Sequence, residues 1–121
     1  MTYVTESGEQ AALIDWCQAQ VALGNYPELA YLTAIPNGGK RDKRTAAKMV
    51  AEGAHAGALD LVLPVARQGA HSFWLEMKIK SGHLSDVQRD YIGFLSRNGH
   101  KVVVAYSFEE ARDALVEYLT K

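Results

Sequence analysis

Residues 59–63 read Leu-Asp-Leu-Val-Leu, and residues 73–79 read Phe-Trp-Leu-Glu-Met-Lys-Ile. Both stretches are apolar runs typical of β-strands, yet Asp60, Glu76 and Lys78 place charge inside them. Charged side chains are depleted in strands and are rarely buried without a partner. These positions therefore require compensation, and a divalent metal ion is one partner that would supply it.

The two stretches also predict how the charges are arranged. Side chains alternate across a strand, so Glu76 and Lys78 share one face. If Asp60 lies at the matching end of the preceding strand, two carboxylates and an ammonium group converge. Oxygen ligands in a small open cluster favour Mg²⁺ or Mn²⁺, with the lysine beside the reacting phosphate. An exposed sheet face with a lysine–carboxylate ion pair gives the same pattern, so these residues alone leave both interpretations open.

The elements around these stretches follow from periodicity and turn signals. Residues 58–65 and 72–79, joined by 66–71, predict adjacent antiparallel strands. Downstream, the capping-box spacing at 85–88 predicts the start of a helix, and Asn98 and Gly99 predict its end. Residues 101–106 predict a strand buried on both faces, and Ser107 begins a last helix. Upstream, the sequence predicts a helix from the capping-box spacing at 7–10, a strand at 31–35 and a short helix at 42–52. The order α-β-α-β-β-α-β-α predicts a single α/β domain over 1–121, with a mixed β-sheet flanked by α-helices.

Composition narrows the class of protein. The chain has 121 residues, 48% of them hydrophobic, and no apolar run of the roughly 18 residues that a membrane span needs. The amino terminus lacks the pattern of a secretory signal, so we expect a cytoplasmic protein of phage or bacterial type. Cys17 is the only cysteine, which excludes an internal disulfide. The net charge is −1, but five cations are close together: Lys40, Arg41, Lys43, Arg44 and Lys48. They predict a locally positive surface or, equally, an ordinary solvated helix start.

Several short motifs occur here in a fixed order: residues 35–38 (Ile-Pro-Asn-Gly), 52–61 (ending Gly-Ala-Leu-Asp-Leu), 75–78 (Leu-Glu-Met-Lys), 82–85 (Gly-His-Leu-Ser), Gln88 and Gly99. Together they resemble the VRR-NUC domain, a family of virus-type replication-repair nucleases in the PD-(D/E)xK restriction-endonuclease-like superfamily. The resemblance runs from Glu9 to the last helix and implies a restriction-endonuclease-like core. The family usually has proline before the motif aspartate, where this chain has Leu59, which puts the local geometry in doubt.

The resemblance implies a role for each matching residue. Asp60 and Glu76 would bind the metal together with the Met77 carbonyl, and Glu9 would complete the site. The catalytic residues would be Asp60, Glu76, Lys78 and Gln88. Glu9 and Gln88 also have plain structural explanations as a helix N-terminal carboxylate and a capping-box partner. The four histidines, His55, His71, His83 and His100, show no metal-ligand spacing and are predicted to be turn and surface residues.

The function hypothesis is a DNA endonuclease dependent on Mg²⁺ or Mn²⁺, with the basic stretch from Lys40 to Lys48 on the phosphate backbone. Phosphate contacts carry no sequence information, so we expect selectivity for DNA structure, such as branched or four-way junction DNA, in replication, recombination or repair. One active site per chain favours a homodimer, as in stand-alone members of the family. The alternatives are a non-catalytic nucleic-acid-binding module with the same fold and a hydrolase of a small phosphate ester.

Overall fold

The computed structural model describes residues 4–36 and 43–121. The elements in chain order are α1 (Glu6–Leu23), the 3₁₀ helix η1 (Pro27–Tyr31), β1 (Thr33–Ala34), α2 (Lys43–Ala51), β2 (Leu61–Leu63), β3 (Phe73–Met77), α3 (Asp86–Arg97), β4 (Lys101–Ala105) and α4 (Phe108–Thr120). The order matches the prediction, with one 3₁₀ helix added. None of the described helices is long and apolar enough to cross a membrane.

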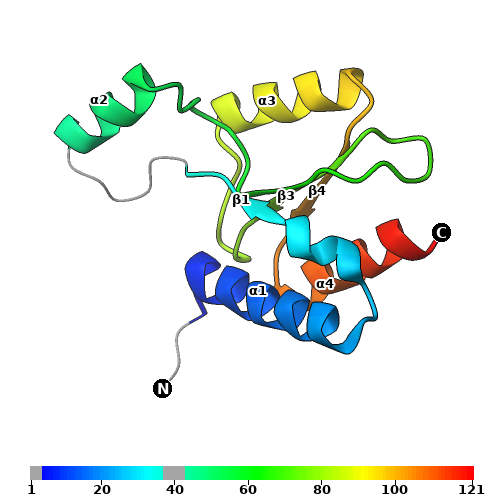
Figure 1. The fold of residues 1–121 in the computed structure, drawn as a ribbon. Helices are drawn as coiled ribbons and strands as arrows, with labels where there is room; N and C mark the ends of the chain where they lie inside the picture. Colours follow the sequence, from blue (N-terminus) through cyan, green and yellow to red (C-terminus); the bar gives the residue numbers. More distant parts are fainter. Residues whose placement is uncertain (1–3, 37–42) are drawn as a thin grey trace.

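The four strands form one mixed sheet in the order β1-β2-β3-β4. β2 pairs antiparallel with both β1 and β3, which confirms the predicted antiparallel strands, and β3 pairs parallel with β4. The parallel pair needs a crossover, and α3 supplies it. Figure 1 shows α3 on one face of the sheet and α1 with α4 on the other. The predicted mixed sheet flanked by helices is therefore confirmed.

The alternation along β3 assigns each residue to one of these two layers. Phe73, Leu75 and Met77 are fully buried in the hydrophobic core beneath the sheet. Trp74 lies on the other face, where its ring contacts Tyr91 of α3 at a centroid distance of 6.0 Å. Glu76 follows Trp74 by two residues and so lies on the α3 face as well.

Two local predictions were wrong. Residues 31–35 form only the short strand β1, because Pro27 begins a 3₁₀ helix that places Leu29 in the core. The first helix begins at Glu6 rather than at a capping box over 7–10, since the Thr5 hydroxyl already accepts a hydrogen bond from the Gly8 amide at 2.9 Å.

The strand β4 also differs from its prediction. Val102, Val103 and Val104 are only partly buried, whereas the β-branched run predicted burial on both faces. The reason is topological, because β4 is an edge strand of the described sheet. The helix start at Ser85 was predicted correctly, since its hydroxyl accepts from the Gln88 amide and the Gln88 side chain accepts from the Ser85 amide.

Candidate active site

Asp60 lies immediately before β2 and is held by contacts on two sides. Its carboxylate oxygen Oδ2 accepts a hydrogen bond from the Met77 amide at 2.8 Å. Its backbone carbonyl accepts one from the Ile35 amide, also at 2.8 Å. The half-buried aspartate therefore lies beside the end of β3, as the sequence predicted.

Gly57 fixes the approach of Asp60 to α3. Its φ of +84° belongs to the left-handed region, and a Cβ built there would lie 2.6 Å from the Val87 carbonyl oxygen. Only glycine combines this backbone conformation with so close an approach. Leu59, at the position where the family has proline, is fully buried. The departure from the family pattern thus places an apolar side chain in the interior.

Glu76 is the buried acid of the site, with only 2% of its surface exposed. Its oxygen Oε2 accepts a hydrogen bond from Gln88 Nε2 at 2.8 Å and lies 3.7 Å from Lys78 Nζ. Its other oxygen, Oε1, is buried and has no hydrogen-bond partner within the described part of the chain. Burial and the nearby charge of Asp60 raise the pKa of Glu76 to about 7, although Lys78 opposes the shift.

The Gln88 side chain contacts the start of α3 and the Glu76 carboxylate at the same time. Its Oε1 accepts from the Ser85 backbone amide at 2.9 Å, while its Nε2 donates to Glu76. The sequence analysis left the capping role and the active-site role as alternatives. In the structure, one side chain makes both contacts, because its two ends point to different partners.

These residues line one open cleft of about 420 Å³. Asp60, Glu76, Lys78 and Gln88 all contribute to its wall, so four of the predicted site residues are brought together. The Lys78 side chain is only 12% exposed, which keeps its charge close to the acids.

Two further residues of the cleft were missed in the sequence, Glu6 and His83. Glu6 lies one turn before Glu9 on α1, and its charge also raises the pKa of Glu76. Glu9 does not line the cleft, since its Oε1 accepts a hydrogen bond from the Phe108 amide at 3.1 Å, at the start of α4. Both glutamates occupy the first two turns of one helix, and only the packing of α1 decides which of them faces the cleft. His83 could have been identified from the sequence by its position between Lys78 and Ser85, the residue that caps α3.

The side chains of the cleft can be compared with the ligands that a divalent metal ion requires. Among residues 4–36 and 43–121, no three His, Cys, Asp or Glu side chains form a ready metal cage. Mg²⁺ does not require one, because it binds through one or two carboxylates and keeps several waters. The buried, partnerless Oε1 of Glu76 beside Asp60 fits such an ion. The carbonyl of Met77 stays a predicted ligand. The Met77 amide donates a hydrogen bond to the Asp60 carboxylate.

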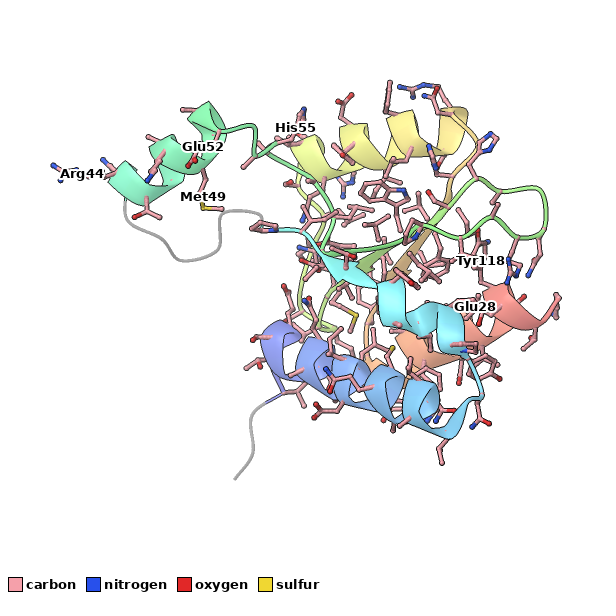
Figure 2. The ribbon with its side chains drawn as sticks, in the orientation of Figure 1. Glu28, Arg44, Met49, Glu52, His55 and Tyr118 are labelled. Carbon is pink, nitrogen blue, oxygen red and sulfur yellow. The ribbon has the colours of Figure 1, made fainter. Side chains whose placement is uncertain are left out.

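The predicted basic surface is described only in part, because Lys40 and Arg41 lie outside the described residues. Lys43, Arg44 and Lys48 are exposed on α2, a helix without a buried residue. Figure 2 shows Arg44 at the end of α2 that lies farthest from the sheet. Cys17 is buried.

Comparison with solved structures gives a match over nearly the whole chain. A solved structure described as a "VRR_NUC domain protein" aligns with 98% of this chain and 91% of its own, at a TM-score of 0.81 and 25% sequence identity. No family model matches the chain. No curated protein matches it either. The structural match spans nearly the whole chain and includes every element that forms the cleft. It confirms the resemblance seen in the sequence: this chain is a nuclease-like domain with the VRR-NUC fold.

Proposed function

We propose that the chain is a nuclease that hydrolyses DNA phosphodiester bonds with the help of Mg²⁺ or Mn²⁺. The observation that carries this proposal is the buried Glu76 carboxylate, whose Oε1 lacks a hydrogen-bond partner in the described structure and whose pKa is raised to about 7. A protein gains nothing in stability from such a group, so a bound cation is its best explanation. The nuclease-like fold supports DNA as the substrate.

The proposed roles follow from the contacts. Asp60 and Glu76 would hold the ion, with the Met77 carbonyl as a further ligand, and Gln88 keeps the Glu76 carboxylate in one orientation. The ion would supply Lewis-acid assistance and a more acidic bound water. Lys78, whose Nζ lies 3.7 Å from Glu76, would orient the attacking water and offset charge that develops on the phosphate.

The choice of DNA is proposed from charge. Lys43, Arg44 and Lys48 form an exposed basic helix face, which suits the phosphate backbone, and Lys40 and Arg41 would extend it. Phosphate contacts carry no sequence information, so we propose selectivity for branched or four-way junction DNA. Cutting both strands of such a junction needs two active sites, which we propose a homodimer supplies. We further propose that it acts inside the cell in replication, recombination or repair.

The test is cleavage of single-stranded, duplex, flap and four-way DNA with Mg²⁺ and with Mn²⁺. Asp60→Ala and Lys78→Ala should each reduce cleavage by at least about 10²-fold, the usual loss when a charge-stabilising group is removed. The matched controls are Asp90→Ala and Lys101→Ala, because both residues are exposed and neither lines the cleft. If Lys78→Ala cuts as fast as Lys101→Ala, the assignment is wrong. If the parent binds DNA but cuts none of it, the chain is a non-catalytic binding module.

A further inference from the structure

A second concave surface lies next to the active cleft, between the end of α2 and the start of α3. We define it as the side groove, lined by Ile35, Met49, Glu52, His55, Ala58 and Tyr91, with a volume of about 430 Å³. Figure 2 shows Met49 on α2, Glu52 just after the end of that helix, and His55 in the segment that leads from α2 to β2. This groove is as large as the active cleft, and none of its polar groups has a role in the proposed chemistry.

The side groove and the active cleft share a wall. Ala58 lines both of them and stands two residues before Asp60. Two residues of extended chain span at most about 7 Å. A nucleotide next to a phosphodiester in the cleft would therefore reach the groove.

The surfaces of the groove suit a flat aromatic ligand. Ile35, Met49 and Ala58 provide apolar walls. Tyr91 and His55 add two rings, 5.2 Å apart at an interplanar angle of 62°. Nucleobases stack on aromatic side chains with little regard to sequence. The thioether of methionine also contacts aromatic rings favourably.

Two of the polar groups that line the groove, His55 and Glu52, offer acceptors. His55 Nδ1 lies 2.6 Å from the Ala56 carbonyl oxygen, which can only accept, so Nδ1 carries the hydrogen. In the neutral ring, Nε2 is then an acceptor. Glu52 adds an exposed carboxylate, which is also an acceptor when ionised. A ligand that presents N–H donors on its edge would complement both groups.

We propose that the side groove binds an unpaired nucleobase of the DNA strand whose phosphodiester occupies the active cleft. This inference rests on the proposed function and adds a substrate class to it, namely DNA with an unpaired nucleotide beside the cut. Adenine, cytosine and guanine carry exocyclic amino groups with two N–H donors, whereas thymine has no amino group and offers only its ring N3–H. The groove therefore prefers those three bases to thymine.

Charge favours DNA over a second copy of the chain as the occupant. Lys43, Arg44 and Lys48 lie on α2, the helix that supplies Met49 to the groove. Two copies that met across this face would bring their cations together, which is unfavourable. A nucleic-acid strand would neutralise the same cations while its base entered the groove.

The experiment measures both binding and cleavage with duplexes that carry one unpaired nucleotide. In the first arm, the Lys78→Ala variant without metal is titrated against DNA with 2-aminopurine as the unpaired base. Entry into the groove should change the fluorescence of the probe through stacking on Tyr91. Replacing the unpaired base by an abasic site should weaken binding about 5- to 100-fold, the range expected for one stacked base.

In the second arm, the parent enzyme cuts substrates whose unpaired base is adenine, cytosine, guanine, thymine or absent. Cleavage should be fastest with the three amino-bearing bases and slowest at the abasic site. Met49→Ala and Glu52→Gln should reduce this base dependence. Both variants should fold, because α2 contributes no buried residue and Glu52 is exposed. Val50→Ala is the matched control, since Val50 is exposed on the same helix and does not line the side groove.

The outcomes separate the two proposals. If the parent cuts DNA but the abasic and adenine substrates behave alike, the groove proposal is overturned while the nuclease function stands. If no substrate is cut but the 2-aminopurine signal responds and Met49→Ala removes the response, the groove stands and the nuclease function fails. If Met49→Ala changes only the sedimentation of the protein and leaves base dependence intact, a second copy covers the groove and the proposal is wrong.

Discussion

Replacing Glu76 by glutamine should make the stability of the metal-free protein less dependent on pH. The folded chain holds a proton on Glu76 up to about pH 7, whereas the unfolded chain releases it near the usual pKa of 4.5. Between these values the folded state binds more protons, so the free energy of unfolding falls as the pH rises. The contribution is complete below the unfolded pKa and is lost as the pH rises through 7.

The size of the effect follows from the shift in pKa. Moving the pKa of a carboxyl from 4.5 to about 7 corresponds to roughly 3 kcal/mol of unfolding free energy. Glutamine cannot ionise, so it avoids this loss at high pH. It also places an amide near the site of the partnerless Oε1, which costs some stability, but that cost does not change with pH.

The assay is urea unfolding of parent and Glu76→Gln at pH 5 and at pH 8.5, without metal. Because pH 5 already lies above the unfolded pKa, the difference in unfolding free energy between variant and parent should rise by roughly 2.5 kcal/mol in favour of the variant. The exposed Asp90→Asn serves as the control and should show no comparable change. Adding Mn²⁺ at pH 8.5 should stabilise the parent and not Glu76→Gln, since only the parent offers the carboxylate. A difference that stays constant across this pH range would refute the reasoning.

Three other outcomes are expected. Gly57→Ala should lower the unfolding free energy by about 2–3 kcal/mol in urea, because its new Cβ would lie 2.6 Å from the Val87 carbonyl oxygen; an unchanged midpoint would contradict this. Gln88→Ala should cost about 1–3 kcal/mol, since both Glu76 and the start of α3 lose a hydrogen bond, and a loss limited to a few tenths would argue against the dual contact. Cys17 should resist maleimide in the folded protein at pH 8, because burial raises the pKa of its thiol to about 11; modification should appear only as urea unfolds the chain.

The strongest sequence patterns gave the fold correctly. Periodicity and turn signals correctly predicted three features: the Ser85 capping box, the antiparallel pair of β2 and β3, and the final β-α unit. These features depend on local physics, namely capping and alternation. The 3₁₀ helix at Pro27–Tyr31 was missed because so short an element shows no helical period, and the strand predicted at 31–35 overlaps it only at Tyr31. Its burial of Leu29 depends on α1, which no local pattern reveals.

The site was predictable to a similar degree. Asp60 and Glu76 were singled out because charge inside a strand is unusual, and Gln88 because it matches the glutamine of the family motif. Glu6 was missed and Glu9 was chosen in its place, since two acids in adjacent turns of a helix look alike in sequence. Which of them faces the cleft is set by how α1 packs against α4 and the sheet. Such choices between neighbouring side chains need the tertiary structure.

The two hydrogen bonds of Gln88 limit which substitutions this position can accept during evolution. One side chain closes the first turn of α3 and also holds the carboxylate of Glu76. Selection for a well-formed helix and selection for an intact acid therefore act on the same position. Glutamate would also complete the capping box. An ionised glutamate could not donate a hydrogen bond to the Glu76 carboxylate, so a screen for folding and a screen for activity should both favour glutamine at this position.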